Sequence, residues 1–257
     1  MTIFKSNAKK VAENGPAFYA QPKALTRKWQ RDWWTLLHPP YTMMHLSFVV
    51  VGACLAGPVN SARLLVTVAA FFLAVGVGAH ALDELQGRPL STSIPTWQLV
   101  VASSVGLGGA VALGVVGLFL VSPYLALFIA VGVTVALGYN LELFHARLHT
   151  DAVFALGWGA FPLLTAYYAQ HANLSVPALL AAAFAAFVSH TQRVLSSPAR
   201  ELRRRTASVD GVQELLDGTR VPITSESMLA PFERALRGLC WATFALALAL
   251  MYLRLHH

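Results

Sequence analysis

The fold of this chain is decided by stretches such as residues 97–120, which read WQLVVASSVGLGGAVALGVVGLFL and contain no charged residue. A helix of that length rises about 36 Å, which is enough to cross the hydrocarbon core of a bilayer, about 30 Å thick. Of the 257 residues, 56% are hydrophobic and 12% are charged, and that charged fraction is about half of what soluble domains carry. The sequence therefore predicts an all-α integral membrane protein.

Apolar runs of similar length recur along the chain and predict about seven transmembrane helices. Small residues crowd several of them, as between Gly106 and Gly117, which favours close helix packing in lipid. The expected spans are residues 42–57, 62–80, 97–120, 123–141, 151–169, 176–193 and 232–254. The chain thus divides into a basic N-terminal segment, residues 1–41, and a single transmembrane domain, residues 42–257, with a polar loop at 194–231.

Two segments outside the spans have helical patterns of their own. Trp29, Trp33 and Trp34 stand beside basic residues, which predicts an amphipathic helix over residues 28–37 at the membrane interface. Within the polar loop, residues 212–216 are expected to form a short helix over the mouth of a cavity.

The net charge of +7 is unevenly distributed. If the spans alternate in direction, all of the 19 Lys and Arg residues except Arg63 and Arg254 lie on the N-terminal side. Such an excess marks the cytoplasmic side of a membrane protein, so no nucleic acid is expected as a partner. The predicted location is the cell membrane, with the N-terminus in the cytoplasm and the C-terminus on the opposite side.

Polar clusters follow three of the spans. Span two runs into residues 80–84, span four into residues 139–149, and span six into residues 189–193. Ionisable groups are costly at the ends of membrane helices unless they pair, bind a ligand or reach water. Because even-numbered spans all end on the N-terminal side, the sequence predicts that the three clusters line one cytoplasmic cavity.

The spacing of histidine and carboxylate residues raises a metal hypothesis. On a helix Glu142 would share a face with His145, and His145 with His149. Imidazole and carboxylate together suit iron, zinc or manganese. The candidate metal ligands are His80, Asp83, Glu84, Glu142, His145, His149 and His190. The alternative is that these residues only pair or cap at helix ends, as Asp151 would in a first turn.

With these motifs in place, the chain resembles the UbiA superfamily of intramembrane prenyltransferases. The resemblance rests on the motif Asp-Glu-Leu-Gln-Gly-Arg-Pro-Leu at residues 83–90, on Tyr139 and Asn140 at the end of span four, and on the polar motif after span six. It implies a bundle of seven to nine transmembrane helices with a central cavity. There, magnesium and two aspartate-rich motifs would bind a prenyl diphosphate for prenyl transfer or cyclisation.

Carried over residue by residue, the resemblance makes Asp83, Glu84 and Tyr139 the catalytic candidates, with both carboxylates on magnesium. The residues expected to hold the substrate are Arg88, Asn140, Arg147, Gln192 and Arg193. The chain departs from the family where His80-Ala81 replaces an Asn-Asp pair. It departs again after span six, where residues 189–200 contain no carboxylate in place of the second aspartate motif.

Three functions are compatible with these patterns. The first is a UbiA-like enzyme acting on a prenyl diphosphate or another lipophilic isoprenoid. The second is a transition-metal enzyme on the same fold, oxidising or hydrolysing a lipid-soluble substrate. The third is a non-catalytic lipid- or quinone-binding membrane module. In each case the expected partners are a lipophilic small molecule and membrane lipid.

Overall fold

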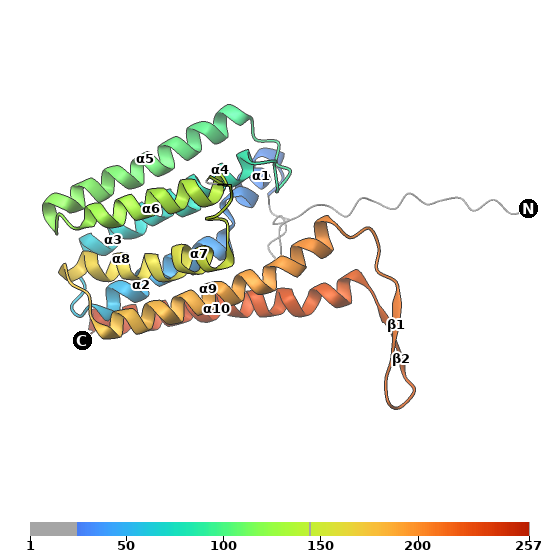
Figure 1. Cartoon of the computed structure of the whole chain (residues 1–257). Helices are drawn as coiled ribbons and strands as arrows, with labels where there is room; N and C mark the ends of the chain where they lie inside the picture. The colour runs from blue at the N-terminus through green and yellow to red at the C-terminus, as the bar shows by residue number, and fades with distance from the viewer. Residues whose placement is uncertain (1–24, 144, 257) are drawn as a thin grey trace, which may run out of the picture.

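The computed structural model describes residues 25–143 and 145–256, which form helices lying side by side (Figure 1). Each of the expected spans is helical. Five are single helices, α2 (Pro39–Leu55), α5 (Thr96–Leu120), α6 (Leu125–Asn140), α9 (Val176–Arg204) and α10 (Ser225–His256). The other two are composite, and combine α3 (Ser61–Phe71), η1 (Phe72–Ala79) and α4 (His80–Leu85), or α7 (Asp151–Ala155), η2 (Leu156–Ala160) and α8 (Phe161–His171).

Five of these segments are long and apolar enough to cross a membrane. They are Ser61–Leu85, Thr96–Leu120, Asp151–His171, Val176–Arg204 and Ser225–His256. Helix α6 is a shorter apolar helix of 16 residues, and α2 has 17 residues. The predicted all-α bundle is confirmed, and the five candidate spans indicate an integral membrane protein.

Small residues allow the helices to approach one another closely. A Cβ at Gly52 of α2 would lie 2.1 Å from the carbonyl oxygen of Leu163 in α8, and one at Gly159 of η2 would lie 2.4 Å from that of Ala185 in α9. Around these crossings α2, α8, α9 and α10 share a core that includes Met44, Phe48, Leu163, Ala185 and Cys240. Close backbone contact therefore contributes to holding the centre of the bundle together.

Two composite spans contain π-helical turns. Segment η1 ends at the residue before His80, and η2 contains Trp158. A π-helical turn shifts the faces on which the following residues lie, and such turns are frequent at functional sites. Both segments lie next to the residues that form the candidate site described below.

The helix expected over residues 28–37 is confirmed as α1 (Lys28–Leu37). Its residue Leu36 packs against Ala81, Leu90 and Ile94, so α1 covers α4 and the loop that follows it. Trp34, two residues before Leu36 and therefore on the opposite side of the helix, is exposed, as expected for an interfacial helix. Residues 1–24 of the basic N-terminal segment lie outside the described residues.

The polar loop between spans six and seven is shorter than expected and is not helical. Helices α9 and α10 both continue past the bundle, and a two-stranded antiparallel hairpin, β1 (Gly211–Glu214) and β2 (Arg220–Ile223), joins them (Figure 1). The prediction of a short helix over residues 212–216 is therefore wrong. Asp217 and Gly218 form the turn, where Gly218 has a φ of +83° and Asp217 accepts a hydrogen bond from the Thr219 N–H. The hairpin extends away from the helix ends and does not cover the site.

Candidate functional site

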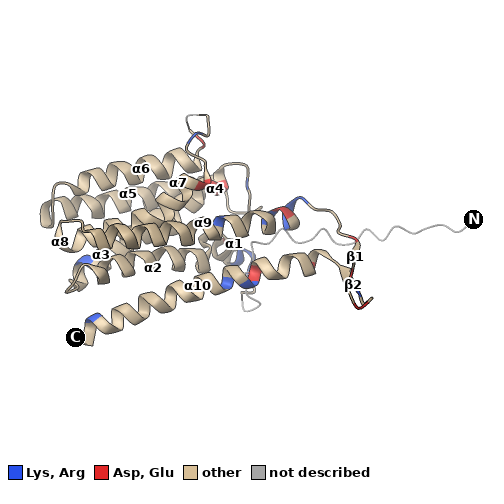
Figure 2. Ribbon diagram, turned by 60° about the horizontal axis from the view of Figure 1, so that its bottom comes forward, with Lys and Arg blue, Asp and Glu red and all other residues tan. Residues whose placement is uncertain are grey.

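The ends of spans two, four and six meet at one end of the bundle, as the sequence predicts. Helix α4, the C-terminus of α6 and the second half of α9 lie together with α1 and the start of α7 (Figure 1). Most of the charged residues gather at this end and along the parts of α9 and α10 that continue past the bundle (Figure 2). Arg63 of α3 and Arg254 of α10 lie at the other ends of their spans. This arrangement matches the predicted grouping of the polar clusters on one face.

The first wall of the site is the pair His38 and His80. His38 joins α1 to α2 in a left-handed conformation (φ 44°), and its ring lies 4.7 Å from that of His80 between centroids. The Nδ1 of His80 donates a hydrogen bond to the Gly76 carbonyl over 3.2 Å. Burial lowers the pKa of His38 well below its usual range, and the charges of His80, Arg204 and Arg200 lower it further. His38 is therefore a neutral imidazole at pH 7.

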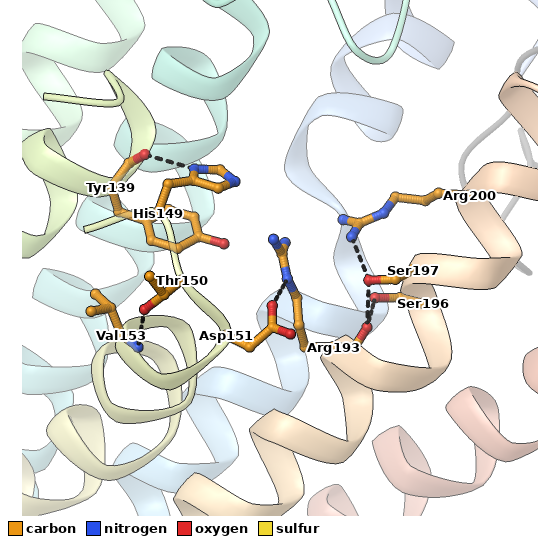
Figure 3. A network of polar contacts seen from close by, with 9 residues as sticks. All are labelled: Tyr139, His149, Thr150, Asp151, Val153, Arg193, Ser196, Ser197 and Arg200. Carbon is orange, nitrogen blue, oxygen red and sulfur yellow. Dashed lines mark hydrogen bonds and ion pairs between the residues drawn. The ribbon is translucent and has the colours of Figure 1, made fainter. Parts of the chain in front are cut away.

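The second wall is a stripe of arginines on α9, formed by Arg193, Arg200 and Arg204. Their spacing of seven and then four residues places them on one face of the helix. The Nε of Arg193 pairs with the Asp151 carboxylate over 3.0 Å, and one nitrogen of Arg200 donates to the Ser197 hydroxyl over 3.1 Å (Figure 3). Arg200 and Arg204 both interact electrostatically with Asp83 of α4. The stripe therefore faces the first polar cluster.

Tyr139, near the C-terminus of α6, contacts both Arg193 and His149. Its ring stacks on that of His149 with centroids 4.3 Å apart, and it is tilted against the ring of Trp158 with centroids 4.7 Å apart. The Nδ1 of His149 donates to the Tyr139 carbonyl over 3.1 Å (Figure 3). The guanidinium of Arg193 lies 5.9 Å from the Tyr139 ring centre and 5.3 Å from that of Phe154, within the range of cation–π attraction.

Several buried polar atoms at this end have no hydrogen-bond partner within the described residues. They are the Tyr139 hydroxyl, the Ser189 hydroxyl and the Oε1 of Gln192. Gln192 also lies within hydrogen-bonding reach of Tyr41 on α2. Each buried polar group left unsatisfied costs about 1–3 kcal/mol. A polar ligand or water at this position would remove that cost.

An apolar cavity of about 380 Å³ lies below the polar end, between α3/η1, α5, α6 and η2/α8. Ala79, Ala136 and Trp158 line its inner end, and Trp158 also contacts Tyr139. Its outer end reaches Asn60 and Arg63. The cavity thus runs from the polar site towards the far end of the bundle, and its walls suit a hydrocarbon chain.

Two residues expected in the site are instead committed to the loop that follows α4. The carboxylate of Glu84 is fully buried and accepts hydrogen bonds from the Leu90 N–H, the Thr92 N–H and the Thr92 hydroxyl, each at 2.8–2.9 Å. The guanidinium of Arg88 donates to the Ile94 carbonyl at 2.6 Å and to the Thr96 hydroxyl at 2.9 Å. Both side chains fold this loop, where the sequence suggested catalysis and substrate binding.

The expected ligands in the second cluster do not converge. Helix α6 ends at Asn140, so Glu142 and His145 lie in irregular turns with positive φ and do not share a helical face with His149. Glu142, His145, Arg147 and His190 are exposed, and the Asn140 amide donates to the Ala136 carbonyl within its own helix. Within residues 25–143 and 145–256, no three His, Cys, Asp or Glu side chains are grouped so as to hold a metal ion.

The carboxylates at this end of the bundle are also a poor match to the two acidic motifs with which the family that the chain resembles binds magnesium. Both oxygens of Glu84 already accept hydrogen bonds, and Asp151 is paired with Arg193. Asp83 remains as the single carboxylate facing the site, and α9 contributes arginines where a second acidic motif would stand. Magnesium in such sites is usually held by one or two carboxylates together with substrate phosphates and water, and of the two acidic motifs that the resemblance implies these residues supply one carboxylate, Asp83.

Sequence reasoning misses His38, Tyr41, Arg200 and Arg204. In the sequence His38 resembles an isolated interface residue. The two arginines fall in the polar loop because span six is expected to end at residue 193, whereas α9 continues to Arg204. The spacing of Arg193, Arg200 and Arg204 would reveal the stripe if that helix were extended.

Comparisons with known protein families, with characterised proteins and with solved structures find no match to this chain. The fold and the site define an all-α integral membrane protein with a polar, arginine-containing end next to an apolar cavity.

Proposed function

We propose that the protein is a UbiA-like intramembrane enzyme acting on a prenyl diphosphate, by prenyl transfer or cyclisation, at a cytoplasmic cavity. The observation that carries the proposal is the junction of two environments. Arg200 and Arg204 interact electrostatically with Asp83 at the polar end, and the apolar cavity of about 380 Å³ reaches Trp158, whose ring contacts that of Tyr139. An amphipathic substrate with an anionic head and a hydrocarbon tail matches both parts.

Such a reaction begins with heterolysis of the bond between the allylic carbon and the diphosphate oxygen. Both electrons leave with the diphosphate, so its negative charge grows. Guanidinium groups of the α9 stripe would stabilise this charge. The allylic cation would form beside the faces of Tyr139 and Trp158, and aromatic faces attract cations. The cation would then bond to an acceptor or to a double bond of its own chain, and a proton would be lost.

The proposal leaves Asp83 as the acidic group of the site. Its carboxylate can orient the arginines or accept the proton released at the end of the reaction. Tyr139 would present its unpartnered hydroxyl and its ring to the reacting carbon. Arg88 and Glu84 would act at a distance, by holding the loop over residues 86–95 in place.

The test uses the full chain in nanodiscs and a radiolabelled C15 or C20 allylic diphosphate. Release of inorganic pyrophosphate and formation of an organic-extractable product are expected for the native chain. Asp83→Asn should lower the rate by roughly a hundredfold or more, as general acid–base groups typically contribute. Tyr139→Phe keeps the aromatic face but loses the hydroxyl, and should lower the rate by less. Glu142→Gln, which removes an exposed carboxylate, should leave the rate unchanged.

The same experiment separates the alternatives. Saturable binding of the diphosphate with neither pyrophosphate release nor product would favour a non-catalytic lipid-binding module and would contradict the enzyme. The described residues contain no observation that favours the transition-metal enzyme over the prenyl-diphosphate enzyme.

A further inference from the structure

We propose that the site binds the phosphate groups of its ligand directly through the α9 arginines, without a divalent cation. The inference deepens the proposed function and rests on it, because it concerns how the head group of the same ligand is recognised. It follows from the mismatch between the residues present and the magnesium clamp that the family resemblance implies.

The positive charge of the α9 arginines favours an anionic ligand. Arg193 and Arg200 repel each other electrostatically, as do Arg200 and Arg204. Among the described residues, Arg193 has a carboxylate partner, Asp151, whereas neither Arg200 nor Arg204 forms an ion pair. Like charges four residues apart destabilise a helix by about 0.2–0.5 kcal/mol. A bound anion between them would turn this repulsion into attraction.

The spacing of Arg200 and Arg204 suits a phosphate group. With a rise of 1.5 Å per residue, the Cα atoms of Arg200 and Arg204 lie about 6 Å apart along the helix axis. Both guanidinium groups lie close enough to His38, at the α1–α2 junction, and to Asp83 of α4 to interact electrostatically with them. Two guanidinium groups on consecutive turns can grip one phosphate or a diphosphate, because each presents a planar fork of donors.

Two buried neutral polar groups near the arginine stripe lack hydrogen-bond partners within the described residues. The Gln192 side chain is 4% exposed and its Oε1 has no partner within the described residues, and the same holds for the Tyr139 hydroxyl. Gln192 lies on the α9 turn next to Arg193, and Tyr139 interacts electrostatically with both Arg193 and Arg200. Tyr139 therefore brings an unpartnered, buried hydroxyl close to Arg200, which forms no ion pair in the described part of the chain, and this combination favours a polar anionic ligand.

Inorganic pyrophosphate is the probe, measured by calorimetry on the full chain in nanodiscs of zwitterionic lipid. We expect saturable binding in excess EDTA, and magnesium in place of EDTA should not strengthen it, because the arginines bind the free anion directly. Arg200→Gln and Arg204→Gln should each weaken binding by roughly tenfold to a hundredfold, the loss of a charge-assisted hydrogen bond. Arg205→Gln, at the exposed next position, is the matched control and should bind like the native chain.

Binding that requires magnesium, or that survives both arginine substitutions, would overturn the inference. Thermal unfolding of each variant shows whether it is folded, and Arg200→Lys gives a second variant that keeps the charge but loses the planar fork.

A second arm identifies the source of the phosphate. If anionic phospholipid added to the nanodiscs displaces pyrophosphate, the arginine site stands but its ligand is a lipid headgroup. That result would contradict the proposed prenyl-diphosphate enzyme but would support direct phosphate binding by the arginines. If pyrophosphate binding is insensitive to anionic lipid, the site is reserved for a diphosphate ligand, and both proposals gain support.

Discussion

Asp83 and Glu84 are neighbours in the chain but occupy different environments. Glu84 points into the protein, where three donors from the following loop surround its carboxylate. Asp83 lies one position further round α4 and faces the arginines of α9. The acidic pair therefore divides into one structural and one site-facing carboxylate, a distinction that only the packing of the loop reveals.

Replacement of Glu84 by Gln tests the structural role. Gln keeps one acceptor oxygen but places an amide donor against a backbone N–H, so the variant should lose about 2 kcal/mol of stability. For a chain of this size that loss lowers Tm by roughly 4–8 °C. Thermal unfolding in detergent measures the shift, with the exposed Glu142→Gln as control. An unchanged Tm together with lost substrate binding would instead return Glu84 to the site.

His38 makes the stability of the polar end dependent on pH. Its pKa is lowered in the folded chain by burial and by the nearby charges of His80, Arg204 and Arg200. The unfolded chain therefore takes up a proton at a higher pH than the folded chain does. Stability is complete above the usual histidine pKa of about 6.5 and falls as pH drops below it.

The expected result is a Tm that decreases between pH 7 and pH 5, and a smaller decrease for His38→Asn. His190→Gln removes an exposed histidine and should leave the pH dependence as it is in the native chain. If His38→Asn and the native chain lose stability in parallel, another group is responsible for the pH dependence.

At the scale of helices, the crossing of α2 and α8 is set by a single glycine. The backbone of α8 at Leu163 lies where a Cβ on residue 52 would stand. By contrast, Gly108 on α5 has open space beside it. Position in the bundle, and not the residue type alone, thus decides which glycines hold helices together.

Gly52→Ala should force the two helices apart and cost about 1–3 kcal/mol, as overpacking typically does. Gly108→Ala adds the same methyl group without a clash and should be neutral or slightly stabilising, because alanine is the better helix former. Chemical or thermal unfolding compares the two variants directly. Equal stability of both would show that the α2–α8 crossing is looser than described.

The sequence sufficed for the helices but not for the irregular parts of the site. Long uncharged runs such as residues 97–120 can form little else in lipid, so the helices are predicted to within a few residues, apart from the extensions of α9 and α10. Of the seven spans expected, five are long and apolar enough in the described chain to cross a membrane. The extension of α9 to Arg204 is missed, since arginines usually mark the end of a membrane span. The turns after Asn140, with their positive φ values, break the helical spacing that suggests a metal site. Residues three or four apart share a face only while the helix continues.

At the scale of the whole molecule, the alternating spans place the polar site and the protruding α9–α10 arm at one end and the C-terminus at the other (Figure 1). The distribution of lysine and arginine predicts that the polar end is cytoplasmic. Both native cysteines, Cys54 and Cys240, are buried, so introduced cysteines can report on sidedness.

Ser208→Cys lies at an exposed position between α9 and the hairpin. A membrane-impermeant maleimide should label it only in inverted vesicles, whose outer face is the cytoplasmic one. Leu255→Cys, exposed near the C-terminus, should react only in right-side-out preparations. Labelling of both positions from the same side would contradict the topology, and labelling with the sides exchanged would place the site on the outer face.

The central claim is that the ends of α4, α6 and α9 form one site for an amphipathic molecule with an anionic head. Equilibrium binding of a radiolabelled C15 allylic diphosphate to the purified full chain tests it most directly. The account predicts saturable binding at about one molecule per chain, reduced roughly tenfold or more by Arg200→Gln and retained in Arg205→Gln. Binding that does not saturate, or that is equal in the two variants, would contradict it.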